Sequence, residues 1–308
     1  MIPHTRRVRA AALLPSTSRR AARSSIANLL EAATSELSDG GVVSARLEAE
    51  QLLGHVLGLP RHQLYLDAHR TVTDGQARRL EGMVTRRTRR EPLQYIIGMT
   101  EFYGLEMECA HASLIPRSET ELLVEAVIKL ANSFHAPRIV DLGTGTGCIA
   151  LALARHLPQA EIFALDLSLA ALRLAQRNAA HLGLSARLTF LHRDMLAEGS
   201  LEDIAPFDLI VSNPPYVLVS ERDGLQPEIR DWEPAIALFV EGDGLSFYRA
   251  IARLARRHLS ETGMVAVEMA SQRVAPIAEV FTRAGLSVWG AVCDYNDNVR
   301  HLIATTSL

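Results

Sequence analysis

The chain has 308 residues, 48% of them hydrophobic and 22% charged, a composition typical of a soluble globular protein with one large or two modest domains. The first 23 residues contain six arginines and no acidic residue, which leaves 26 basic and 35 acidic residues in the remainder, a net charge of −9. An acidic body argues against broad nucleic-acid binding, because that needs a basic face.

The cysteines and the apolar runs exclude further classes of protein. Cys109, Cys148 and Cys293 are scattered with no metal-type spacing, so we expect no metal site. A sparse, odd set of cysteines indicates a reducing compartment and no disulfide framework. No apolar run approaches the roughly 18 residues of a membrane-spanning helix, and we expect no membrane partner.

Residues 1–23 form a basic N-terminal extension that is rich in arginine and alanine. This composition is typical of an organellar transit peptide, which would place the protein in the mitochondrial matrix. The favoured alternative is a disordered bacterial extension, or a start codon assigned too early. In that case we expect the protein to be cytoplasmic.

Residues 24–91 carry apolar side chains at three- and four-residue steps, which predicts a small all-helical domain. A turn through Gln63-Leu64-Tyr65 separates its second helix from its third. The expected helices run from Ser24 or Ser25 to Asp39, from Ser44 to Leu57, and from Thr73 or Asp74 to about Arg90.

The third expected helix carries a run of arginines. Such a run is either a ribosome- or RNA-facing patch or, more often, a solvated face. These residues are Arg78, Arg79, Arg86, Arg87, Arg89 and Arg90.

Residues 92–115 contain short apolar runs broken by Gly98 and Gly104, which predicts a hairpin linker. A helix then begins near Ser118, where Glu121 three residues later completes a candidate capping box.

Strand-like runs and helical periods alternate over residues 116–308, the pattern of a parallel, doubly wound sheet. The fold class is therefore α/β: a Rossmann-like, mostly parallel seven-stranded sheet after a small helical domain. The expected strands are 138–142, 161–165, 188–192, 207–211, 264–268, 286–292 and 301–305. The expected helices between them are 149–157, 168–181, 246–259 and 274–284.

A glycine-rich loop joins the first of these strands to its helix. Glycines permit a tight turn and close approach of a ligand to the backbone at a helix N-terminus. The spacing G-x-G-x-G differs from the dinucleotide pattern G-x-G-x-x-G, and Asp141 before the loop would repel a pyrophosphate and attract a cationic aminoacyl group. Both features favour S-adenosylmethionine over NAD. The expected cofactor-binding residues are Gly143, Thr144, Gly145, Thr146 and Gly147.

Two further positions are candidates for the nucleoside part of this cofactor. Asp166 ends the second strand, where a carboxylate can accept both ribose hydroxyls. The alternative is that Asp166 caps the next helix, a task that Ser168 can also perform. Met195 follows the third strand, where its side chain and the backbone can enclose an adenine.

The fourth strand ends in Asn213-Pro214-Pro215-Tyr216. Each proline restricts the residue before it to extended backbone, so the chain leaves the strand along a stiff path. The Asn213 side chain and the Pro214 carbonyl are then free to accept hydrogen bonds from a planar NH2 group. A simple turn after a strand is the alternative. Because the carboxyl ends of parallel strands share one edge of a sheet, Asn213 is expected to face the methyl donor.

Together, this tetrapeptide and the glycine loop are similar to class I methyltransferases that modify planar amino groups. Three further stretches resemble the release factor glutamine methyltransferase family (PrmC or HemK). They are Glu91 to Gly98, Leu114 to Glu121, and Glu233 to Leu238 continuing to Gly242-Asp243-Gly244-Leu245. The resemblance covers about residues 26–305, and only local loop geometry is put in question by its departures, which are Ser118, Ala270 and Val299.

The resemblance implies that the substrate is a glutamine in the Gly-Gly-Gln motif of a peptide chain release factor. S-adenosylmethionine would methylate its side-chain amide nitrogen. The implied catalytic residues are Asn213, Pro214 and Tyr216, and the implied substrate-binding residues also include Pro215. The helical domain would recognise the substrate. We expect a monomer that binds no nucleic acid directly.

Other functions remain open at this point. The nearest is a glutamine methyltransferase of a large-subunit ribosomal protein. A DNA or RNA exocyclic-amine methyltransferase shares the tetrapeptide, but usually adds a basic target-recognition region. A non-catalytic cofactor-binding adaptor would be expected to lose Asn213 or a loop glycine.

Overall fold

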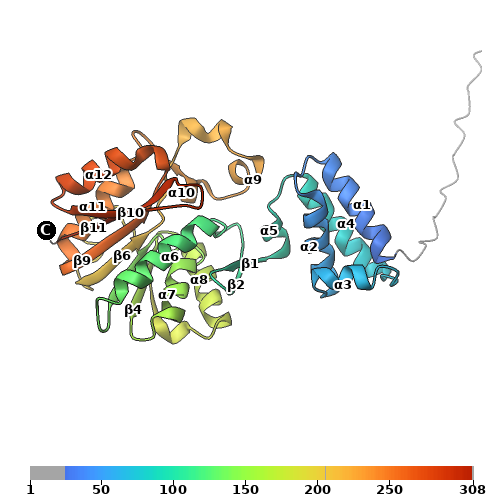
Figure 1. Cartoon of the computed structure of the whole chain (residues 1–308), viewed down its shortest axis with the longest axis horizontal. Helices are drawn as coiled ribbons and strands as arrows, with labels where there is room; N and C mark the ends of the chain where they lie inside the picture. The colour runs from blue at the N-terminus through green and yellow to red at the C-terminus, as the bar shows by residue number, and fades with distance from the viewer. Residues whose placement is uncertain (1–24, 205, 307–308) are drawn as a thin grey trace, which may run out of the picture. The chain divides into compact units, whose positions relative to one another are not determined.

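The computed structural model describes residues 25–204 and 206–306. The predicted basic extension at 1–23 lies outside these residues. The chain divides after Thr88 into two compact units (Figure 1). None of the described helices combines the length and the apolar surface that crossing a bilayer requires.

The first unit is built from helices around its own apolar core. Its helices are α1 (Ile26–Asp39), α2 (Ala45–Leu57), α3 (Arg61–Leu66) and α4 (Asp74–Thr88). The side chain of Ser25 caps α1 by accepting a 3.3 Å hydrogen bond from the N–H of Asn28. Side chains from all four helices fill the core, including Ile26, Leu37, Leu52, Leu53, Leu64 and Val84.

Two expectations for this unit are wrong in detail. Helix α3 occupies the stretch where only a turn was predicted, because its buried Leu64 faces the core and the hydroxyl of Tyr65 bonds to the buried Glu50. The arginine run is not entirely a solvated face. Arg78, Arg79, Arg86 and Arg89 are exposed, but Arg87 is buried and paired with Glu48.

The second unit begins with a short helix and a hairpin. Helix α5 (Leu93–Ile97), which the sequence did not reveal, precedes strands β1 (Met99–Phe102) and β2 (Leu105–Glu108). These strands pair antiparallel where a hairpin was predicted. Both turn residues, Tyr103 and Gly104, have positive φ, at 50° and 71°, as a tight two-residue hairpin turn requires.

The predicted capping box at the next helix is wrong. Helix α6 (Ser118–Ala131) has Arg117 at its N-cap, so Ser118 is already its first residue. Glu121 accepts a 2.7 Å hydrogen bond from the N–H of Tyr103 in the hairpin turn. The carboxylate therefore holds the hairpin against α6 and is not used in a cap.

The sheet confirms the predicted fold class. Its strand order is β10-β11-β9-β6-β3-β4-β5, and β11 runs antiparallel to both of its neighbours while the other pairs are parallel. The strands are β3 (Arg138–Leu142), β4 (Glu161–Asp166), β5 (Leu188–His192), β6 (Phe207–Ser212), β9 (Leu259–Glu268), β10 (Ser287–Cys293) and β11 (Val299–Thr305).

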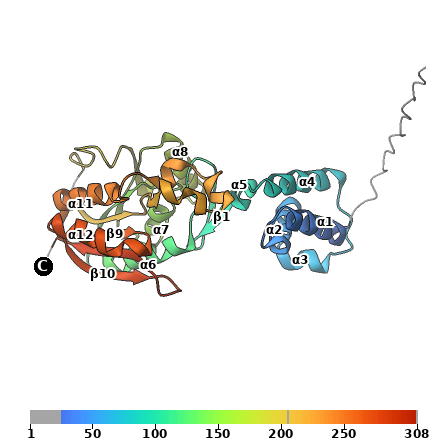
Figure 2. The same ribbon diagram turned by 90° about the horizontal axis from the view of Figure 1, so that it is seen from above.

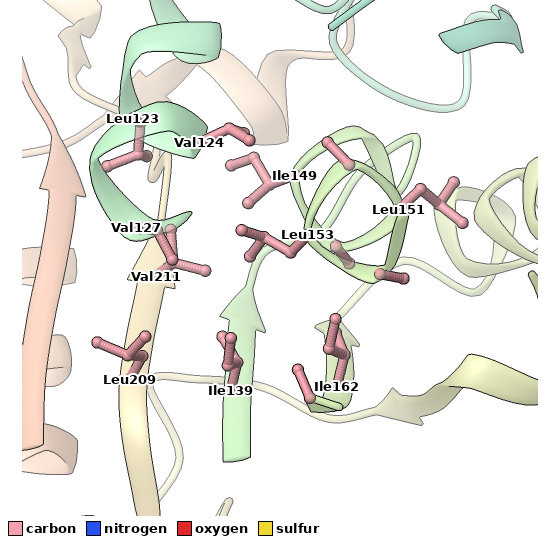
Figure 3. Packing of buried hydrophobic residues seen from close by; sticks show 14 of the residues in the cluster. Leu123, Val124, Val127, Ile139, Ile149, Leu151, Leu153, Ile162, Leu209 and Val211 are labelled. Carbon is pink, nitrogen blue, oxygen red and sulfur yellow. The ribbon is translucent and has the colours of Figure 1, made fainter. Parts of the chain in front are cut away.

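Helices cover both faces of this sheet (Figure 1, Figure 2). They are α6, α7 (Cys148–His156), α8 (Leu169–His181), α11 (Ser246–His258) and α12 (Val274–Arg283). A hydrophobic core lies on each side of the sheet, and alternate residues along a strand contribute to one core or the other. Ile139 of β3 and Leu209 of β6 pack with side chains of α6 and α7 (Figure 3), whereas Val140 and Ile210 pack with those of α11 and α12. Burial on both faces explains the continuous apolar runs that predicted these strands.

An insertion follows β6. It contains β7 (Val217–Leu218), which pairs in parallel with β8 (Phe239–Val240), and the short helices α9 (Pro227–Arg230) and α10 (Ala235–Leu238). Ile236 and Ala237 of α10 reach the wall of the cavity described next.

Candidate active site

A cavity of about 270 Å³ lies at the carboxyl ends of the parallel strands. The loops after β3, β4, β5 and β6, the stretch 112–117 and α10 supply most of its lining, and a few residues of α6, α7, α8 and α11 complete it, among them Thr120 of α6. The cavity brings together eight of the expected site residues: Gly143, Thr144, Gly145, Thr146, Asp166, Met195, Asn213 and Pro215. Gly147, Pro214 and Tyr216 are not among its lining residues.

The glycine loop takes a backbone path that favours glycine. Gly143, Gly145 and Gly147 have φ values of +78°, +58° and +83°. A Cβ on Gly143 would lie 3.1 Å from Cε of Met195, so a side chain here would intrude between the two walls of the cavity. Gly147 serves packing instead, because a Cβ there would lie 3.0 Å from Cβ of Ala175.

Asp141 lies directly beneath the loop and is fully buried. Burial raises the pKa of this carboxyl to about 7, while the Thr144 hydroxyl, which donates to it at 2.6 Å, opposes the shift. A cation held by the loop would favour the ionised carboxylate. The buried carboxyl of Asp141 beneath the loop therefore suits a cationic ligand better than a pyrophosphate.

Asp166 is held at the end of β4 by two backbone groups. Its carboxylate oxygens accept 2.8 Å hydrogen bonds from the N–H groups of Gly145 and Ser168. Burial raises its pKa, and these two donors oppose the rise. The cap of α8 is Ser168, whose side chain accepts from the N–H of Ala171. Asp166 is thus not the N-cap of α8, and it lines the cavity.

Asn213 enters the cavity wall from the end of β6. Its side-chain Nδ2 donates a 3.0 Å hydrogen bond to Oγ1 of Thr120, a residue of α6. Pro215 also lines the cavity, whereas Pro214 is buried outside the lining set. The Tyr216 ring packs against the core formed with α11 and α12.

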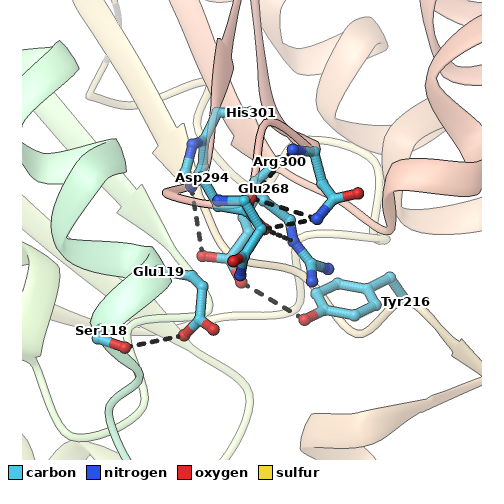
Figure 4. Close-up of polar contacts among 9 residues, drawn as sticks. Ser118, Glu119, Tyr216, Glu268, Asp294, Arg300 and His301 are labelled. Carbon is cyan, nitrogen blue, oxygen red and sulfur yellow. Dashed lines mark hydrogen bonds and ion pairs between the residues drawn. The ribbon is translucent and has the colours of Figure 1, made fainter.

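The hydroxyl of Tyr216 lies 3.5 Å from Oε1 of Glu268 (Figure 4), and its carbonyl accepts a hydrogen bond from Arg273. Burial raises the pKa of the Tyr216 phenol, so this group stays a hydrogen-bond donor. Tyr216 anchors the tetrapeptide from behind, away from the lining of the cavity.

The three stretches that carried the family resemblance meet around the cavity. Glu233 is buried with Arg117 as its ion-pair partner, and its Oε2 accepts a 3.2 Å hydrogen bond from the N–H of Ile115. The Tyr95 hydroxyl donates to the carbonyl of Ser113 at 2.7 Å. These contacts hold the stretch 112–117 in place as one wall of the cavity, which we call the 112–117 wall.

Sequence reasoning missed two residues of the site, Thr120 and Glu268. Thr120 lies in the stretch from Leu114 to Glu121 and Glu268 ends the expected strand 264–268, but neither was given a role. Since 93 residues separate Thr120 from Asn213, no local pattern links them. The sequence feature that could have found them is that Thr120 and Glu268 are polar residues in segments whose apolar pattern predicts burial. Among the described residues, no group of His, Cys, Asp and Glu side chains could hold a metal ion.

Comparisons with known proteins identify the family. The family model described as "PrmC N-terminal domain" matches residues 28–98, and that described as "Methyltransferase small domain" matches residues 118–225. A protein of Geobacter sulfurreducens named release factor glutamine methyltransferase is 43% identical over 252 residues, which are 81% of this chain and 85% of that protein. The chain belongs to the release factor glutamine methyltransferase family.

A second member of this family, from Chlorobaculum tepidum, is 39% identical over 278 residues, or 88% of this chain and 94% of that protein. Among solved structures, the hMettl16 catalytic domain is similar in fold, with a TM-score of 0.52 and 18% identity over 76% of this chain and 82% of that one.

As a member of the release factor glutamine methyltransferase family, the protein is a methyltransferase and its cofactor is S-adenosylmethionine. The residues present fit this cofactor. Glycines keep the loop side of the cavity clear, a buried carboxyl lies beneath the loop, and the Asp166 carboxylate lines the cavity with acceptor positions left over.

Proposed function

We propose that this enzyme methylates the side-chain amide nitrogen of the glutamine in the Gly-Gly-Gln motif of a peptide chain release factor. The observation that carries the proposal is the match, over four fifths or more of the chain, to proteins named for this activity. The cavity supports it, because an asparagine amide stands in its wall at the end of β6.

The proposed cofactor site consists of the loop from Gly143 to Gly147, Asp166 and Met195. The loop residues would hold the aminoacyl part, with Gly147 acting through the packing of the loop onto α8. Asp166 would accept hydrogen bonds from the ribose hydroxyls, and the buried Met195 would contact the adenine. Bound S-adenosylmethionine supplies a methyl group on a positively charged sulfur.

The proposed substrate site is Asn213-Pro214-Pro215-Tyr216. An amide nitrogen is a poor nucleophile because resonance occupies its lone pair. The Asn213 Oδ1 and the Pro214 carbonyl would each accept one N–H of the substrate amide and turn its nitrogen toward the methyl group. Orientation of this kind can lower a barrier by roughly 7–11 kcal/mol. Pro215 would pack against the amide plane, and Tyr216 would anchor the turn.

The transfer itself is balanced without a further reactant. The N–C bond forms as the C–S bond breaks, and the sulfur keeps the electron pair of that bond. The carbonyl oxygens beside the nitrogen stabilise the positive charge that develops there. The nitrogen then loses one proton to water.

The remaining parts of the proposal concern the whole chain. Residues 24–91 would contribute to recognition of the release factor, 92–115 would link them to the catalytic part, and 116–308 would carry the reaction. The protein would act as a cytoplasmic monomer without direct contact to nucleic acid. Light scattering of the purified chain tests the oligomeric state.

One assay tests the substrate. Purified protein and methyl-labelled S-adenosylmethionine are offered a release factor, the same factor with its Gly-Gly-Gln glutamine changed to alanine, or ribosomal subunits. We expect label in the first sample alone. Label only in ribosomal protein would replace the proposal with its nearest alternative, and label in ribosomal RNA would make the enzyme a nucleic-acid methyltransferase.

A further inference from the structure

Asn213 is the first member of a buried chain of hydrogen bonds that leads away from the cavity. Its Nδ2 donates to Oγ1 of Thr120 at 3.0 Å, and the Thr120 hydroxyl donates to Oε2 of Glu268 at 2.7 Å. Thr120 is 2% exposed and Glu268 is 3% exposed, so water does not compete for the bond between them. Asn213 is partly exposed, and it lines the cavity together with Thr120.

With Glu268 ionised, the protons of this chain can be arranged in one way only. A carboxylate accepts hydrogen bonds and donates none, so the single proton of the Thr120 hydroxyl is committed to Glu268. Oγ1 of Thr120 can then only accept, and Asn213 must turn its NH2 group toward it. Oδ1 is the end of the amide that remains for the cavity.

We propose that Glu268, acting through Thr120, is a positioning residue that fixes which end of the Asn213 amide faces the substrate. This inference rests on the role proposed above for Asn213. If the amide were flipped, it would present its own NH2 to the NH2 of the substrate, and neither group could accept. The two ends of an amide have nearly the same shape, so packing alone does not choose between them.

The same carboxylate also serves the other end of the tetrapeptide. Oε1 of Glu268 lies 3.5 Å from the Tyr216 hydroxyl, while Oε2 lies 3.7 Å from Nε2 of the buried His301 (Figure 4). The backbone carbonyl of Glu268 accepts a 3.0 Å hydrogen bond from the Tyr248 hydroxyl, which holds the end of β9 in place. One side chain therefore contacts Tyr216 directly and Asn213 through Thr120.

The first test is Glu268→Gln, which keeps the shape of the side chain. The new amide can turn either its oxygen or its NH2 toward Thr120. With the NH2 there, the Thr120 hydroxyl donates to Asn213 and the Asn213 amide flips, so the chain is no longer held in one direction. We expect kcat to fall about 10- to 100-fold, less than the roughly 100- to 1,000-fold cost of removing an oriented electrostatic partner outright, because Asn213 itself remains. The Kd for S-adenosylmethionine stays within about twofold, because the residues proposed to bind it are untouched.

Two variants of Thr120 form a matched pair. Thr120→Val keeps the shape but removes the hydroxyl, and we expect it to lose kcat as Glu268→Gln does. Thr120→Ser restores the hydroxyl and recovers most of that loss. Equal losses in the two variants would show that restoring the hydroxyl does not restore activity, and would overturn the proposal.

A double variant separates orientation from mere structural support. Asn213→Asp replaces the Nδ2 that donates to Thr120 with a second carboxylate oxygen. This oxygen then faces the Thr120 hydroxyl, whose proton is already donated to Glu268. Adding Glu268→Gln reverses the chain, so that the hydroxyl can donate to the new carboxylate. We therefore expect the kcat of the double variant to be higher than the value obtained by multiplying the effects of the two single variants. Multiplicative losses would contradict the orientation mechanism.

The wild-type reaction distinguishes the two proposals. If the wild-type enzyme labels the release factor and Glu268→Gln does so at the same rate, Glu268 has no positioning role. If the wild-type enzyme labels no release factor, the proposed function fails. The NMR signal of the Asn213 side-chain NH2 still tests the orientation, since we expect slow hydrogen exchange in the wild type and faster exchange in Glu268→Gln. Identical exchange in both proteins overturns the inference.

Discussion

The main-chain N–H of Gly145 donates a 2.8 Å hydrogen bond to the carboxylate of Asp166, so the end of β4 holds the loop that follows β3. The N–H of Ser168 occupies the other carboxylate oxygen at the same distance. An ionised carboxylate has about four acceptor positions, and two remain for a ribose diol. One side chain thus shapes the glycine loop and offers acceptors to the ligand.

We expect Asp166→Ala to weaken the binding of S-adenosylmethionine about tenfold to a hundredfold, because hydrogen bonds to a charged group contribute roughly 1.5–3 kcal/mol. Isothermal titration calorimetry measures the change. The control is Glu161→Ala, at the opposite end of the same strand, where the side chain is exposed and pairs with Arg138. Unchanged affinity in Asp166→Ala would remove this residue from the cofactor site.

Gly147 links the loop to the packing of α7 against α8. It has a φ of +83°, and a Cβ there would lie 3.0 Å from Cβ of Ala175 and 3.1 Å from Cδ1 of Leu151. Gly183, at the end of α8, has a φ of +69° but no atom within 4 Å of such a Cβ. Replacement by alanine therefore strains the backbone at both positions and crowds a neighbour only at Gly147.

We expect Gly147→Ala to lower the free energy of unfolding by about 1–3 kcal/mol more than Gly183→Ala, the usual cost of overpacking a core. Urea denaturation of the two variants measures the difference. Equal losses would mean that the backbone strain accounts for the whole effect and that Gly147 has no packing role.

The sequence predicted the sheet well because its central strands β3, β4 and β6 are buried on both faces, and the edge strand β5 still shows a short apolar run. The segments 138–142 and 188–192 form strands with the predicted bounds, and the tetrapeptide after β6 indeed stands at the edge where the loops converge. The local features that failed depend on distant partners. The predicted cap at Ser118 does not form, because Glu121 accepts a hydrogen bond from the hairpin turn instead. Helix α3 is held by contacts with α2.

The contacts that shape the cavity wall could not be predicted for the same reason. Arg117 and Glu233 are 116 residues apart, and Thr120 and Glu268 are 148 apart. A sequence shows that each of these side chains is charged or polar. Which ones meet is decided by the strand order, which brings α6 and the insertion to the same edge of the sheet.

The ion pair of Arg117 and Glu233 supports a prediction about pH. Burial already raises the pKa of Glu233, and Arg117 opposes that rise. In Arg117→Ala the pKa rises further, so folding favours the protonated acid. Above the pKa that Glu233 has in the unfolded chain, ionising the buried carboxyl costs stability. The free energy of unfolding therefore falls as the pH rises through the pKa that Glu233 has in the folded protein.

We expect Arg117→Ala to lose roughly 3–5 kcal/mol of stability at pH 8, the cost of leaving a buried charge unpaired, and clearly less at pH 5. Denaturation curves across this range measure the slope. Adding Glu233→Gln removes the titrating group, so the double variant should lose the extra pH dependence. A constant loss at every pH would show that the carboxylate is not penalised by burial.

The last prediction concerns Asn213, whose side chain stands in the cavity wall with its Nδ2 committed to Thr120. Asn213→Ala removes the acceptor proposed to orient the substrate amide and leaves the glycine loop and Asp166 in place. We expect turnover on the release factor to fall at least about a hundredfold, with the affinity for S-adenosylmethionine nearly unchanged. Asn132→Ala, at the exposed end of α6, is the control and should be as active as the wild type. Near-wild-type turnover by Asn213→Ala would show that the Pro214 carbonyl and the packing of Pro215 suffice to orient the amide, and the proposed two-acceptor mechanism would be wrong.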